Sequence, residues 1–246
     1  MISHPEIWDF ILIAVVAIQA GILSYVADPR KKSLVLVFPF PFTIATFSLG
    51  GKIDATNVTG LINLAIFTYG VWLFHSRMKI NIIVSIVFFA IFYCICGILL
   101  ARILPQNEMA FWVSCLIVVI AGLMLALFTE CPCENPYRTD LSPLIKIPII
   151  VVVVTLLVMI KKFLSGFMTV FPMVGVVAAY ESRFMLASVC RQIPVLMICL
   201  VSLMMTVKIF SQFFSIYFSF LFGWIVFLIV LKLTGSFLWN LGAQNG

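Results

Sequence analysis

The chain reads VFPFPF at residues 37–42, inside an apolar stretch of the kind that lies in a membrane, and VFPM at residues 170–173 in a similar setting. Proline in a helix interior removes a backbone hydrogen bond and clashes with the preceding turn. Each motif therefore predicts a kinked or broken membrane helix. How the two motifs relate to each other decides the predicted fold.

The composition places the chain in lipid. Hydrophobic residues make up 64% of the 246 residues and charged residues only 10%, whereas a soluble domain has roughly 25% charged residues. No globular core could bury so much apolar surface, so the lipid bilayer is the expected surrounding. Basic residues do not form a stripe with interleaved aromatic residues, and nucleic acid is therefore not an expected partner. The first apolar stretch lacks a basic leader and is longer than a signal peptide core, which predicts a retained first helix.

The chain is expected to be all-α, a polytopic integral membrane protein with about nine transmembrane helices. A helix that crosses a hydrocarbon core about 30 Å thick needs roughly 20 apolar residues. Apolar stretches of about this length lie at 7–27, 33–49, 57–74, 80–104, 109–129, 144–160, 164–180, 192–207 and 209–235. The second and seventh stretches are short, and these two carry the proline motifs.

The two motifs also indicate an internal repeat. The residue numbers of Phe38-Pro39 and Phe171-Pro172 differ by a constant offset (171 − 38 = 133), and this offset places the first four predicted helices on the last four without a gap. One helix is left between the halves, so the second half enters the membrane from the opposite side. The sequence therefore predicts a 4+1+4 inverted-topology repeat, an arrangement common in secondary transporters. Its parts are a first four-helix repeat at 1–105, a linker helix and polar loop at 106–139, and a second four-helix repeat at 140–246.

Prolines at matching positions of two such halves point to a binding site. A helix broken within the membrane offers free N–H groups and a positive dipole end, which favours an anionic substrate. The alternative for the prolines is a pair of kinks that improve helix packing. For the charged residues that follow the second break, the alternative is a pair that anchors the helix at the interface. The predicted substrate-binding residues are Pro39, Phe40, Pro41, Thr43, Pro172, Tyr180, Glu181 and Arg183.

Other polar residues have simpler predicted roles. Asp54 or Thr56 is expected to cap the third helix. Trp224 lies in mid-helix and is expected to pack against a neighbour. Arg191 and Gln192 are expected to open the eighth helix, with Pro194 in its first turn. Polar residues within the apolar stretches are expected to hydrogen-bond a neighbouring helix, and they are Gln19, Asn63, Asn81 and Gln212.

Signatures of enzymes are missing from the sequence. It contains no HExxH, GxSxG, Walker A or GxGxxG pattern, so an enzyme is the third and least favoured class of function, and no cofactor is predicted. Cys131 and Cys133 have the spacing of half a metal site. Zinc needs four ligands, and the two histidines, His4 and His75, are far away in the sequence, so no metal site is predicted.

Charge asymmetry predicts the orientation in a plasma or inner membrane. Cytoplasmic loops hold an excess of Lys and Arg. Of the fifteen lysines and arginines, ten fall on one predicted side of the membrane, opposite the N-terminus: Arg30, Lys31, Lys32, Arg77, Lys79, Arg138, Lys146, Arg183, Arg191 and Lys232. We therefore predict that the N-terminus lies outside the cell and the C-terminus in the cytoplasm. The Lys161-Lys162 pair falls on the outer side and argues against this orientation.

The stretch GFMTVFPMVGVVAAYESR at 166–183 resembles the GlpM-like small membrane proteins, which carry a similar pattern of Gly, Phe-Pro, Ala, Tyr and Arg in a chain about half this length. The resemblance implies a fused, duplicated form of a short multi-span protein. Duplication of a protein able to insert both ways would produce an inverted repeat. The family brings no established reaction with it.

Two functions are compatible with these features. The first is a transporter, or a flippase for a lipid-linked group, that performs no hydrolysis. The alternative is a non-catalytic membrane subunit that scaffolds a larger complex with partner subunits. A transporter predicts a water-accessible cavity between the repeats, whereas a scaffold predicts a filled centre.

Overall fold

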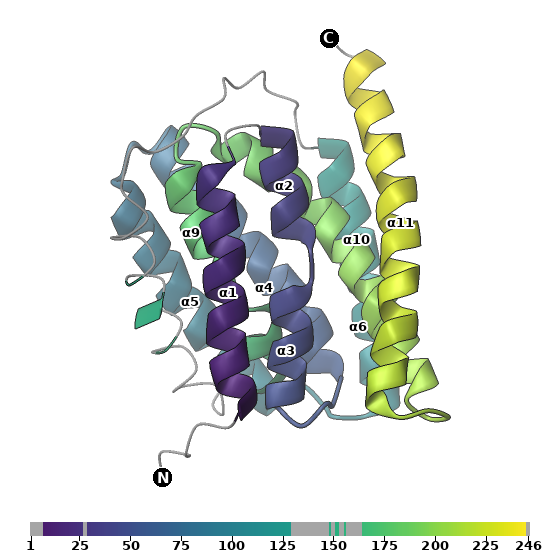
Figure 1. The fold of residues 1–246 in the computed structure, drawn as a ribbon. Helices are drawn as coiled ribbons and strands as arrows, with labels where there is room; N and C mark the ends of the chain where they lie inside the picture. Colours follow the sequence, from purple (N-terminus) through teal and green to yellow (C-terminus); the bar gives the residue numbers. More distant parts are fainter. Residues whose placement is uncertain are drawn as a thin grey trace.

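The computed structural model describes residues 7–26, 29–128, 148, 151–152, 155 and 164–244, and these are helical with short turns (Figure 1). The α-helices are α1 Ile7–Tyr25, α2 Pro29–Val37, α3 Phe40–Ser48, α4 Ala55–Trp72, α5 Ile82–Ile103, α6 Glu108–Phe128, α9 Met173–Glu181, α10 Leu186–Phe210 and α11 Ile216–Gln244. A π-helical turn, η1 Leu73–Arg77, extends α4, and a 3₁₀ helix, η2 Ser165–Val170, precedes α9.

Six of these helices are long and apolar enough to cross a membrane: α1, α4 with η1, α5, α6, α10 and α11. This confirms the all-α prediction and is compatible with a multi-pass membrane protein. The second and seventh predicted spans correspond to the two shorter apolar stretches around α3 and α9. The predicted span at 144–160 lies almost entirely outside the described residues.

Both proline motifs break a helix. Helix α2 ends at Val37 and α3 begins at Phe40, with Pro39 as its N-cap residue. In the second motif η2 ends at Val170, and α9 begins after its N-cap residue Pro172. The breaks follow from local chemistry, because a proline cannot donate the backbone hydrogen bond that would continue the preceding helix.

Neighbouring groups satisfy the carbonyls that the prolines leave without a helical donor. In a continuous helix, residue 39 would donate to Val35 O; here the Gln19 Nε2 amide donates to that oxygen at 2.6 Å and to Phe38 O at 3.2 Å. At the second break, the 3₁₀ geometry of η2 lets Phe171 N reach Met168 O at 3.2 Å. These hydrogen bonds lower the cost of breaking a helix in lipid, where unpaired backbone groups are unfavourable.

The prediction that Pro194 lies in the first turn of its helix is wrong. Helix α10 begins at Leu186, one loop after α9, so Pro194 lies inside it. A continuous backbone at residue 194 would donate to Cys190 O, and the Tyr69 hydroxyl of α4 takes that place at 3.2 Å. The sequence signal was misleading because membrane helices tolerate an interior proline when a neighbouring helix supplies the missing donor.

Some helix bounds in the first and last parts of the chain share the offset of the proline motifs. Helix α3 spans 40–48 and α9 spans 173–181, so both of their ends are separated by the offset of the proline motifs, and the α4–η1 helix and α10 end at Arg77 and Phe210 with the same separation. Helices α3 and α9 run in opposite directions along the bundle (Figure 1). Helix α3 runs toward the start of α1, where Ser48 Oγ donates to Asp9 Oδ1 at 2.5 Å.

Helix α9 runs toward the other end of the bundle. Its last carbonyl, Glu181 O, accepts a hydrogen bond from Lys32 Nζ of α2 at 3.4 Å. Lys32, expected in a loop, is instead only 4% exposed.

Helices α4 and α10 lie at the centre of the bundle, and α5, α6 and α11 present apolar side chains outward. Within the 18-residue apolar segment of α10, 61% of the residues are buried, against 22% in the corresponding segments of α6 and α11. Helix α10 is therefore a core helix, although it is long enough to span a membrane. Polar groups link the core helices: Asn63 Nδ2 donates to Tyr93 O at 3.0 Å, and the Tyr93 hydroxyl donates to Phe167 O at 2.8 Å.

Of the predicted polar roles, those of Gln19, Asn63 and Asp54 are confirmed. Asp54 caps α4 by accepting from Thr56 N at 2.8 Å, within a capping box that includes Asn57. Asn81 and Gln212 were predicted inside spans, and this is wrong: Asn81 is the N-cap of α5, and Gln212 lies in the exposed turn between α10 and α11.

Candidate binding cavity

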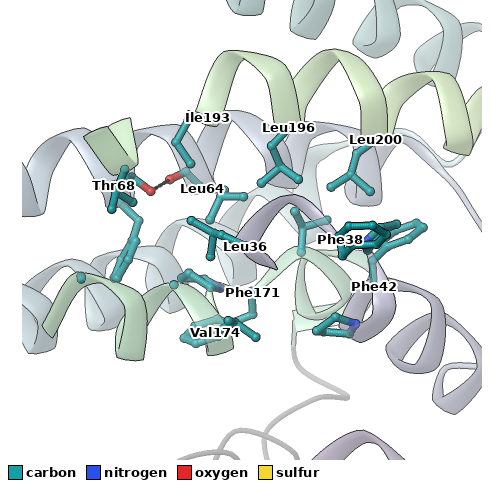
Figure 2. Close-up of a pocket in the computed structure, with 18 of the residues that line it drawn as sticks. Leu36, Phe38, Phe42, Leu64, Thr68, Phe171, Val174, Ile193, Leu196 and Leu200 are labelled. Carbon is teal, nitrogen blue, oxygen red and sulfur yellow. Dashed lines mark hydrogen bonds between the residues drawn. The ribbon is translucent and has the colours of Figure 1, made fainter. Parts of the chain in front are cut away.

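A cavity of about 80 Å³ lies between the two helix breaks. Residues from both breaks line it, and α4 and α10 supply its other walls. Figure 2 shows their side chains converging: Leu36, Phe38 and Phe42 around the first break, Phe171 and Val174 around the second, Leu64 and Thr68 from α4, and Ile193, Leu196 and Leu200 from α10. The tertiary structure therefore brings together two motifs that are far apart in the chain.

Three of the predicted site residues, Pro39, Pro41 and Pro172, line this cavity. Phe40 and Thr43 do not. The Phe40 ring is half exposed and lies 4.9 Å from the Trp224 ring of α11.

Thr43 turns toward α11 as well. Its hydroxyl donates to Pro39 O at 2.9 Å and accepts from Trp224 Nε1 at 3.2 Å. Two of the predicted ligand contacts are therefore packing contacts between α3 and α11, and the predicted role of Trp224 in helix packing is confirmed.

The three predicted residues at the end of α9, Tyr180, Glu181 and Arg183, also lie outside the cavity lining. The Arg183 guanidinium lies 5.1 Å from the Tyr180 ring and 5.1 Å from the Phe184 ring. Glu181 is only 1% exposed. Arg183 is therefore a cation at a helix C-terminus, where the helix dipole favours positive charge, and it is not a group that reaches a ligand between the breaks.

The starts of α3 and α9 both border the cavity. The first backbone hydrogen bonds across these starts are Thr43 N to Pro39 O at 3.0 Å and Val176 N to Pro172 O at 2.7 Å. The N–H groups before them, on Phe42 and Val174, have no acceptor within their own helix. Both residues line the cavity, which therefore lies at two positive helix ends.

The lining is otherwise apolar. In the described part of the chain its polar side chains are Gln19, Thr68 and Thr169, and it includes no charged residue. The Thr68 hydroxyl donates to Leu64 O at 3.0 Å, and the Thr169 hydroxyl donates to Gly166 O at 2.7 Å. Gln19 Oε1 is a buried oxygen with no hydrogen-bond partner among the described residues.

Gln19 was not predicted to line a cavity. The predicted helix–helix hydrogen bond is confirmed for its amide nitrogen, which donates to Val35 O, whereas the position of its oxygen depends on the tertiary structure. The available signal was a glutamine on the helix before the proline motif, since freed carbonyls need a donor.

A second, smaller space of about 10 Å³ adjoins the first, and Leu36 and Val189 line both. Lys32, Ser182 and Ser188 supply its polar groups. It is large enough for about one water molecule, and its lining includes Ser182, the C-cap residue of α9.

No group of three or more His, Cys, Asp or Glu side chains that could hold a metal ion occurs in the residues that the structure describes. Cys131 and Cys133, considered above as half a metal site, lie outside those residues.

Comparison with known proteins found no match to this chain among protein-family models, curated proteins or solved structures. The resemblance of residues 166–183 to the GlpM-like proteins therefore stays a prediction. Among the residues that the structure describes, six helices are long and apolar enough to cross a membrane.

Proposed function

We propose that this protein is a membrane transporter, or a flippase for a lipid-linked group, whose substrate passes through the cavity between the two broken helices. The observation that carries the proposal is that both proline breaks line one cavity. Discontinuous helices that meet at a repeat interface are the usual position of a transporter site.

The proposal includes an inverted-topology repeat. Support comes from the common offset in residue number between the bounds of α3 and α9 and from their opposite directions. In such repeats, transport occurs when one half rocks against the other around the fixed site. The contact between Trp224 of α11 and Thr43 of α3 would then be an interface between the two halves.

The lining favours a lipid-linked or otherwise apolar substrate over a small anion. An anion would depend on the N–H groups at the starts of α3 and α9, because no lysine or arginine of the described chain lines the cavity. Burying a charge without a partner is costly. Apolar walls instead suit a hydrocarbon group.

A cysteine-accessibility experiment tests the proposal against the alternative of a non-catalytic scaffold subunit. In a background without the seven native cysteines, single cysteines replace Val174 and Leu196, both of which line the cavity. A transporter site opens to water from at least one side, so both cysteines should react with a membrane-impermeant methanethiosulfonate reagent. The measurement is mass spectrometry of protein labelled in vesicles.

Two further variants calibrate the reaction. Val207→Cys, which is fully buried and outside the lining, should stay unreactive, and Lys52→Cys, in an exposed turn, should react fully. If Val174→Cys and Leu196→Cys behave like Val207→Cys from both sides of the membrane, the centre is closed and the scaffold function is the better one.

A further inference from the structure

Gln19 defines what the cavity can bind. The side chain is 5% exposed and lines the cavity, and both of its amide hydrogens are used, one on Val35 O and one on Phe38 O. Because backbone carbonyls only accept hydrogen bonds, the nitrogen must be the atom that faces them. The oxygen, Oε1, is thereby the atom left over, buried and without a partner in the described part of the chain.

The other polar side chains of the lining cannot donate to a ligand either. The Thr68 hydroxyl is committed to Leu64 O, and the Thr169 hydroxyl to Gly166 O. Each threonine has one hydroxyl hydrogen, so every side-chain donor on the described cavity wall is in use. A ligand that pairs with Gln19 Oε1 must therefore supply the hydrogen-bond donor.

The charge of the ligand is also constrained. The described lining contains no carboxylate to pair with a cation, and the positive ends of α3 and α9 repel one. The positive ends of α3 and α9 would attract an anion, but it would meet the lone pairs of Gln19 Oε1 and no cationic side chain of the described lining. A neutral group avoids both penalties.

We propose that the part of the substrate that enters this cavity is a neutral apolar group with a hydroxyl, of the class of isoprenoid or long-chain alcohols, and that the hydroxyl donates to Gln19 Oε1. A hydroxyl suits the site because its oxygen can also accept from an N–H group at the start of α3 or α9. The inference rests on the proposed transport function, since it specifies the substrate of the same cavity.

Binding of three matched probes to the purified full chain in lipid nanodiscs tests the proposal. The probes are geraniol, its methyl ether and the corresponding carboxylate, geranate, and binding is measured by equilibrium dialysis against empty nanodiscs. The ether keeps the apolar chain but cannot donate. Geraniol should bind roughly tenfold more tightly than the ether, because the ether leaves the buried amide oxygen unpaired, and geranate should bind more weakly than geraniol.

Two variants locate the binding. Leu200 lines the cavity, so the larger side chain of Leu200→Phe should fill part of it and abolish geraniol binding. Leu228→Phe, on the exposed face of α11, should leave geraniol binding unchanged. Gln19→Met keeps the length of the side chain and should make alcohol and ether bind equally. Should that variant fail to fold, the probe series on the unmodified chain and the Leu200→Phe variant still decide the matter.

Equal binding of alcohol and ether, tighter binding of geranate, or no saturable binding of any probe would each overturn the proposal. The last result would mean that the cavity holds only water. None of these outcomes would refute transport, because the accessibility of Val174→Cys and Leu196→Cys tests that function independently of substrate class.

Discussion

Trp224 of α11 donates its indole N–H to the hydroxyl oxygen of Thr43 in α3 at 3.2 Å, although the two residues are 181 positions apart. Thr43 in turn donates to Pro39 O, the carbonyl of the first helix break. The indole of one half of the chain is therefore connected to the break of the other half through one threonine.

This connection predicts a measurable coupling. Trp224→Phe and Thr43→Val should each lower the free energy of unfolding in detergent, and their combination should cost less than the sum of the two. The expected coupling is about 0.6 kcal/mol, the mean for interhelical hydrogen bonds in membrane proteins. Trp112→Phe, on the partly exposed face of α6, is the matched control and should show no coupling to Thr43→Val. Strict additivity of Trp224→Phe and Thr43→Val would contradict the finding.

Gln19 and Pro39 should be epistatic. Gln19→Leu removes the donor to two buried carbonyls and should destabilise the protein by about 1–3 kcal/mol. In that background, Pro39→Ala restores a backbone N–H, which can donate to Val35 O if the helix becomes continuous. Part of the lost stability should therefore return, as measured by thermal unfolding.

The control for this pair is Gln212→Leu, because Gln212 lies in an exposed turn. It should leave the unfolding temperature nearly unchanged. If Pro39→Ala destabilises the Gln19→Leu protein further, Gln19 does not substitute for the missing helical donor.

Two glycines should respond in opposite ways to alanine. A Cβ at Gly166 would clash with Thr56 Oγ1 and lie 2.7 Å from the backbone nitrogen of Asn57, so η2 could not keep its place beside the start of α4. Gly166→Ala should cost about 1–3 kcal/mol, as overpacking does. At Gly21 of α1 nothing lies within 4 Å of the added carbon, and alanine should stabilise the helix by about 0.5–1 kcal/mol. Equal unfolding temperatures for the two variants would contradict the close approach of η2 and α4.

Charge asymmetry predicts the orientation in the membrane. Reporter fusions after Gly246 and within residues 129–143 should both report the cytoplasm, whereas an epitope inserted beside Lys52 should be accessible from outside. Ten basic residues on one side against five on the other are the reason. An external signal from either fusion would reverse the assignment.

The sequence by itself determined the features that depend on local chemistry. Proline lacks an N–H in any surroundings, so the breaks at Pro39 and Pro172 were predictable, and the Asp54 cap follows from the same short-range rules. Apolar length placed α1, α4, α5 and α6 within a few residues of their observed bounds, because a span must match the thickness of a bilayer.

Only the tertiary structure decided which side chains meet. Arg183 follows the second break in the chain yet lies on the rings of Tyr180 and Phe184, whereas Gln19, from a helix before the first break, lines the cavity. Pro194 lies inside α10 because Tyr69 of another helix supplies its missing donor. The positions of Gln19 and Pro194 depend on contacts between residues far apart in the chain. The order of residues along one helix does not specify which side chain of another helix will pair with its freed carbonyl, or which will face the cavity.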